Sequence, residues 1–152
     1  MRPVRRIYGS LALRASRALP GVFAAALWPL ASNSNYLSAA FAMFRSYDGV
    51  GGSFGDTSVQ ATNSDVVNTS VYASVDAASP NRMVLVLINK ATTTKTAALS
   101  VTHGVSFSRA EVYQLTAASP TPQRGSDVVL GQANALRYTM PAMSVTTLVL
   151  RP

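Results

Sequence analysis

The stretch Arg82–Lys90 has the sequence RMVLVLINK, in which every residue from Met83 to Ile88 is apolar. Successive side chains of an extended strand point to opposite faces of a sheet. Both faces of this segment are therefore apolar, as is typical of strands that are buried on both sides. We expect a central strand here.

The segments around this stretch also have the composition of strands. The preceding segment, DVVNTSVYASVD, alternates apolar and polar residues, which predicts one buried and one solvated face. The further expected strands are GDTSVQATN, TKTAALSVTHG, SRAEVYQLTA, DVVLG, ALRYTMP and SVTTLVLRP, whereas AASPTPQRGSD is expected to be a loop. Eight short strands at roughly regular spacing, separated by Gly, Pro and Asn, predict a mainly β fold, an antiparallel β-sandwich.

One helix is expected before the strands, from about Asn35 to Tyr47. Its apolar residues recur at three- and four-residue spacing and share one face; they are Leu37, Ala40, Phe41, Phe44 and Tyr47. We divide the chain into a basic and apolar N-terminal segment (1–31), this amphipathic helix (32–49) and the sandwich (50–152).

Composition excludes several classes of site. The chain has no cysteine, so disulfides and thiolate zinc sites are absent. Five arginines in residues 1–17 account for most of the net charge of +7, and without them it falls to +2. Such a distribution lacks the basic stripe of a specific nucleic-acid-binding protein. The apolar part of residues 1–31 is too short to span a bilayer. It fits an export signal, a buried connecting segment or an appended sequence.

The Gly-rich stretch Phe44–Ala61, FRSYDGVGGSFGDTSVQA, poses the question of a catalytic loop. Phosphate-binding loops precede a helix N-terminus, whereas this stretch follows a helix. Gly51–Gly55 matches the G-x-S-x-G pattern of a nucleophile elbow, which would make Ser53 the nucleophile, His103 the base and Asp56 or Asp127 the orienting acid. The elbow also needs a strand before the serine and a helix after it, and here that order is reversed.

Other candidate sites have weaker patterns. Glycosidase chemistry normally uses two carboxyl groups, but Glu111 is the sole glutamate and the aspartates fall mostly in turns. Asp48 and Asp56 could contribute to a calcium site, although nothing resembles an EF-hand. We expect no metal or other cofactor. Aromatic faces bind sugar rings, so Tyr72 and Tyr113 are candidate polysaccharide contacts, with Tyr138 as a third strand tyrosine.

Several dispersed segments resemble one family. The stretch from Ala39 to Ser74, followed by MVLVLINK, AEVYQL and YTMPAMSVTTLVL, resembles the C-terminal region of family 44 glycoside hydrolases, bacterial endoglucanases that cut cellulose and related β-glucans such as xyloglucan. The resemblance covers about Asn35–Arg151. It implies a β-sandwich packed beside a (β/α)₈ barrel, with the expected helix as the last barrel helix. No position here matches either catalytic glutamate, both of which belong to barrel segments.

The resemblance therefore implies a non-catalytic β-sandwich of a secreted polysaccharide hydrolase, without its catalytic barrel. Two alternatives stay open: a small esterase-like hydrolase using Ser53 and His103, and a free-standing carbohydrate-binding module. Whether the chain alone is an enzyme is uncertain. Expected partners are cellulose or a related β-glucan, the barrel, and a second copy of the chain. Because the helix face would pack on the barrel, we expect a homo-oligomer through residues 22–47, with no specific nucleic acid and no membrane as partner.

Overall fold

The computed structural model describes residues 34–152, in which one helix precedes nine strands. The mainly β prediction is confirmed, with one strand more than expected. The elements are α2 (Ser34–Arg45), β1 (Thr57–Val59), β2 (Thr69–Val75), β3 (Met83–Asn89), β4 (Lys95–Ser100), β5 (Arg109–Thr116), β6 (Ser119–Arg124), β7 (Val128–Val129), β8 (Ala135–Met140) and β9 (Ser144–Arg151).

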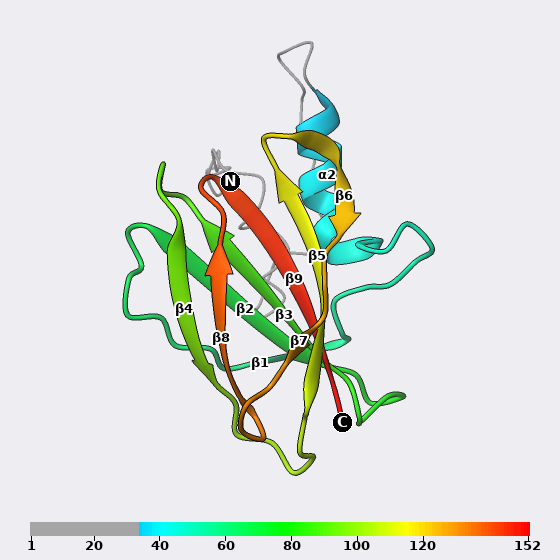
Figure 1. The fold of residues 1–152 in the computed structure, drawn as a ribbon. Coiled ribbons are helices and arrows are strands. Elements are labelled where there is room, and N and C mark those ends of the chain that lie inside the picture. The colour runs from blue at the N-terminus through cyan, green and yellow to red at the C-terminus, as the bar shows by residue number, and fades with distance from the viewer. Residues whose placement is uncertain (1–33) are drawn as a thin grey trace, which may run out of the picture.

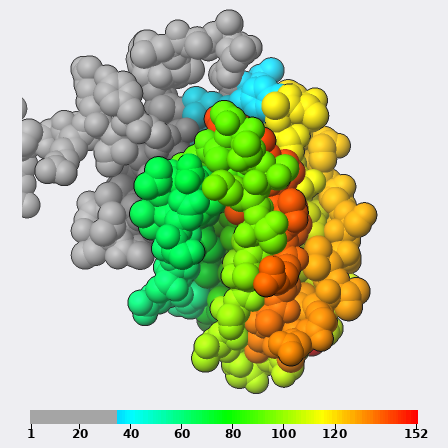
Figure 2. Space-filling view, turned by 60° about the vertical axis from the view of Figure 1, so that its left-hand side comes forward, coloured from blue at the N-terminus to red at the C-terminus, as the bar shows by residue number. Residues whose placement is uncertain are grey.

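The strands form two antiparallel sheets. The larger has seven strands in the order β1-β2-β3-β9-β5-β6, with β7 paired to β5, and the smaller consists of β4 and β8. Figure 1 shows this strand pair lying across the large sheet, and Figure 2 shows β4 directly against β8 at the surface. The sheet is therefore assembled from segments far apart in the sequence, with β3 and β9 at its centre.

The central position of β3 confirms the expectation for RMVLVLINK. Hydrogen bonds join it to β2 on one side and β9 on the other. Its residues alternate between two cores: Met83, Leu85 and Leu87 face one, and Val84 and Val86 face the other. All five are buried, which explains why this strand lacks the apolar–polar alternation of a half-exposed one.

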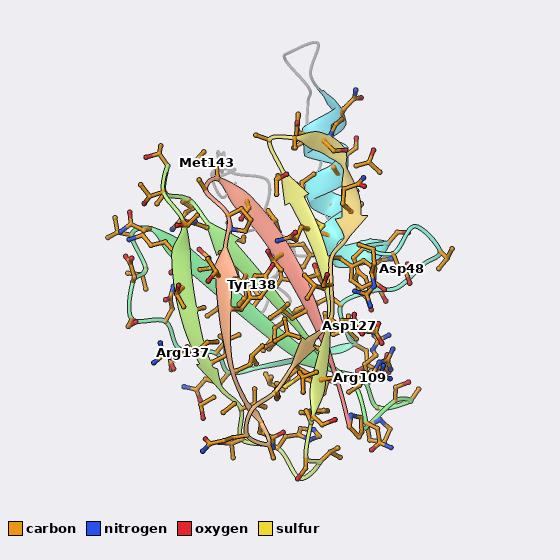
Figure 3. All side chains as sticks on the ribbon, in the orientation of Figure 1. Asp48, Arg109, Asp127, Arg137, Tyr138 and Met143 are labelled. Atoms are coloured by element: carbon orange, nitrogen blue, oxygen red, sulfur yellow. The ribbon has the colours of Figure 1, made fainter. Side chains whose placement is uncertain are left out.

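The first core lies between the large sheet and the β4–β8 pair. Leu136, Tyr138 and Met140 of β8 meet Leu148 and Leu150 of β9 there. Figure 3 shows Tyr138 pointing into this space. The hydroxyl of Tyr138 accepts a hydrogen bond of 2.6 Å from Gln114 Nε2, so its polar end is satisfied within the fold. Tyr138 is therefore a core residue.

The second core lies between the opposite face of the sheet and α2. Met43 and Phe44 are buried against Val86 and Val145, and Tyr47 packs nearby with Val84. This burial corrects the expectation that the helix face needs a barrel to cover it. Compared with the predicted apolar face, the buried face of the helix is shifted towards Met43, and Leu37 and Phe41 are only half-buried.

Polar contacts also attach the end of α2 to the sheet. The carbonyl groups of a helix's last turn lack partners within the helix. Here the Met43 carbonyl accepts a hydrogen bond of 2.8 Å from Thr147 Oγ1 of β9, and the Phe44 carbonyl accepts one of 2.8 Å from Phe54 N. The helix thus ends on the large sheet. Homo-oligomerisation stays a prediction, and residues 22–33 lie outside the described part of the chain.

Two local expectations were wrong. The stretch expected to be a loop contains β6, where Pro120 and Pro122 are accommodated because this strand lies at the sheet edge and pairs only with β5. The strand expected to include Val67 begins later, at Thr69. Residues before it form a turn in which Asp65 accepts hydrogen bonds from Asn68, leaving Val67 79% exposed. The division of the chain at residues 31 and 49 stays a prediction.

Candidate functional site

The Gly-rich stretch forms a closed loop between α2 and β1. Asp48 Oδ1 accepts hydrogen bonds from the backbone N–H groups of Val50 (2.9 Å) and Gly52 (2.7 Å). Partial burial acts to raise the pKa of this carboxyl, but these N–H groups outweigh it and hold the pKa below its ordinary value. Asp48 is therefore a loop-stabilising carboxylate.

Glycine is required in this loop for two different reasons. Gly49 and Gly51 have φ values of 78° and 102°, which other residues rarely adopt. Gly55 approaches β2 so closely that a Cβ atom would lie 2.1 Å from the Val75 carbonyl oxygen. These glycines shape the turn from helix to strand. The backbone of this turn explains why the stretch is rich in glycine, and a phosphate-binding role is not needed to explain it.

The residues of the proposed hydrolase triad form hydrogen bonds with different neighbours in the structure. The Ser53 carbonyl accepts a hydrogen bond of 2.7 Å from Arg82, and Asp56 accepts one of 2.8 Å from the Thr57 hydroxyl. His103, in the loop after β4, accepts one of 3.0 Å at Nδ1 from the backbone N–H of Val105. Within residues 34–152 no hydrogen bond joins Ser53, His103 and Asp56. The triad is not assembled here and stays a prediction.

Glu111 and Asp127 are paired with arginines. Glu111 shares the helix-covered face of β5 with Tyr113, and Arg151 Nε lies 3.1 Å from Glu111 Oε1. Asp127 pairs with Arg124. Each of these two carboxylates thus forms an ion pair with an arginine.

The remaining two aspartates support turns beside β2. Asp65 accepts hydrogen bonds from the side chain and backbone of Asn68, which lower its pKa, and Lys95 Nζ lies 3.5 Å away. Asp76 accepts a bond from Ala78 N and lies 3.6 Å from Arg82. Among the described residues, no group of three or more His, Asp or Glu could hold a metal ion.

The two candidate sugar-stacking tyrosines lie on the helix-covered face. Tyr113 packs against Tyr47, with ring centroids 4.9 Å apart, and the Arg124 guanidinium lies 5.0 Å from its ring centre. Burial is the main cause that raises the pKa of Tyr113. Tyr72 meets Phe44 edge-on at 5.9 Å and also lines a groove. Sugar stacking stays a prediction.

The groove beside Tyr72 has a volume of about 800 Å³. It lies where α2 meets the ends of four strands, and its walls are mainly apolar. They include Tyr36, Ala40, Tyr72, Ile88, Leu115 and Val145. Met143, 59% exposed at the turn between β8 and β9, also lines it and is labelled in the upper left part of Figure 3. Sequence reasoning missed Tyr36 and Met143, because nothing in the pattern places a helix start beside a distant turn.

Comparisons with known proteins identify similar sequences and similar structures. No protein-family model matches the chain. Endoglucanase A of Paenibacillus lautus is 32% identical over 138 residues, covering 86% of this chain but 19% of that protein. A family 44 xyloglucanase from Paenibacillus polymyxa, solved with xyloglucan, is 32% identical with a TM-score of 0.84, covering 95% of this chain and 29% of that one. A family 44 endoglucanase from Clostridium acetobutylium is 27% identical with a TM-score of 0.86, covering 93% and 28%.

These relatives extend well beyond the matched region, since this chain spans less than a third of each. The similarities fit a partial domain of the family. No helix within residues 34–152 is long and apolar enough to cross a membrane.

Proposed function

Because the chain corresponds to part of a family 44 glycoside hydrolase domain, we propose that it is the non-catalytic β-sandwich of an enzyme that degrades cellulose or a related β-glucan. Its work is structural, with weak polysaccharide contact through Tyr113, which lies outside the groove beside α2. Secretion belongs to the same proposal, because the relatives are named for polymeric glucans, which lie outside cells.

The observation that carries this proposal is that every carboxylate of the chain forms a hydrogen bond or an ion pair within the fold. The sequence contains six acidic residues, and all lie in the described part of the chain. Four accept hydrogen bonds from nearby groups, namely Asp48, Asp56, Asp65 and Asp76, and four form ion pairs with lysine or arginine, namely Asp65, Asp76, Glu111 and Asp127. Glycoside hydrolysis needs two carboxyl groups facing one glycosidic bond, one of them free to exchange a proton. Six carboxylates engaged in structural contacts favour a supporting role.

The first prediction concerns hydrolysis. Purified chain incubated with carboxymethylcellulose or xyloglucan is expected to release no more reducing sugar than buffer, and Glu111→Gln is expected to behave identically. A catalytically complete family 44 enzyme serves as the positive control. Release by the wild-type chain that disappears in a folded Glu111→Gln variant would overturn the proposal.

The polysaccharide contact is tested on the same preparation by electrophoresis through a native gel containing xyloglucan. We expect slight retardation that is lost in Tyr113→Ala. No difference between the two proteins removes the contact from the proposal, while strong retardation favours the alternative of a carbohydrate-binding module.

A further inference from the structure

Three polar side chains of the groove beside α2, those of Tyr36, Asn89 and Ser144, form hydrogen bonds within the fold. The Tyr36 hydroxyl donates a hydrogen bond of 2.8 Å to the Ala117 carbonyl. Asn89 Nδ2 and Ser144 Oγ each donate one of 2.7 Å to the Pro141 carbonyl. A ligand that needs many hydrogen bonds, such as a sugar, therefore finds few free partners here. The groove offers mainly apolar surface.

One basic side chain, that of Lys90, lines the groove, and it also forms a hydrogen bond within the fold. Lys90 Nζ lies 2.8 Å from the Val66 carbonyl, to which it donates a hydrogen bond. Anionic ligands are held by cations free to form charge-assisted bonds. A single lysine turned to a backbone carbonyl gives little basis for an acidic ligand, so an uncharged, apolar occupant fits best.

The sequence supplies such an occupant next to the groove. Residues 22–30, VFAAALWPL, contain no charge, and their large side chains are Phe23, Leu27, Trp28 and Leu30. Three residues, 31–33, separate Leu30 from Ser34, the first residue of α2, so an extended chain spans at most about 14 Å between them. A short tether of this kind keeps the segment near the groove at millimolar effective concentration.

We propose that residues 22–30 of the same chain occupy this groove and bury its apolar walls. Burial removes apolar surface from water, so a segment with several large apolar side chains prefers the groove to water. Pro29 disfavours a continuous helix at this point. Occupation in cis would leave the groove unavailable to a second copy of the chain.

Trp28 is the sole tryptophan of the protein and reports on the proposal directly. In the full chain we expect blue-shifted Trp28 emission and weak quenching by acrylamide, both independent of protein concentration. Tyr36→Asp and Met143→Asp place a charge at partly exposed positions of the groove and are expected to increase quenching severalfold. Val129→Asp is the matched control, because Val129 is 80% exposed on β7 and does not line the groove.

Three results would contradict occupation in cis. Full quenching of Trp28 in the wild-type chain would show that the segment is exposed. Unchanged quenching in both groove variants would place Trp28 elsewhere. Protection that is lost on dilution, together with a fall in molecular mass by light scattering, would show that a second copy provides it.

Discussion

Phe44→Ala is expected to lower the free energy of unfolding by about 3–5 kcal/mol, the usual cost of truncating a buried aromatic residue. Phe44 is 2% exposed and contacts two other aromatic rings, Phe54 at 5.6 Å and Tyr72 at 5.9 Å between centroids. The substitution leaves a cavity between α2 and the sheet that neither the helix nor β3 can fill without moving.

Urea denaturation followed by circular dichroism measures this loss as a lower midpoint. Phe44→Leu keeps most of the apolar volume and is expected to lose less. Val50→Ala is the surface control, since Val50 is 88% exposed and its truncation should change stability by no more than about 0.5 kcal/mol. A loss below about 1 kcal/mol for Phe44→Ala would mean that the helix does not pack on this sheet.

Asn89→Asp is expected to have an effect of similar size, about 3–5 kcal/mol at neutral pH, because it leaves a buried charge without a partner. Asn89 is 1% exposed, and its Nδ2 donates hydrogen bonds to the carbonyls of Thr93 (2.9 Å) and Pro141 (2.7 Å). A carboxylate of the same shape would direct a negative oxygen at both carbonyls.

The pH dependence of this variant identifies the cause. Burial opposite two carbonyls raises the pKa of the introduced carboxyl in the folded state above its unfolded value of about 3.9. The folded state then keeps a proton that the unfolded state has lost, so stability relative to wild type falls as pH rises above about 4. Asn81→Asp, at an exposed turn, is the control and should show no such slope. A pH-independent loss in Asn89→Asp would contradict the electrostatic explanation.

Hydrophobic periodicity predicts the fold best where it alone determines burial. The doubly apolar stretch Met83–Ile88 predicted a central strand, and β3 pairs with a neighbour on each side. The prediction was wrong for β6, because two prolines argue against a strand unless the strand is known to lie at an edge.

The candidate site was less predictable from sequence. The glycines of the α2–β1 loop were expected to shape a turn, and their φ values and close contacts agree. The sequence did not reveal which surface covers the helix face. That surface is one face of a sheet whose strands lie far apart in the sequence, and it includes the second apolar face of β3. The groove depends in the same way on Tyr36 and Met143, which the fold brings together from opposite ends of the chain.

Native-state hydrogen exchange tests the central claim, that α2 and both sheets form one self-sufficient body around structurally engaged carboxylates. The account predicts that amides of Phe44 in α2, Val86 in β3 and Thr147 in β9 exchange only through global unfolding, with one shared free energy equal to that from urea denaturation. Exchange of the Phe44 amide through a much less costly local opening, with Val86 and Thr147 still protected, would contradict it.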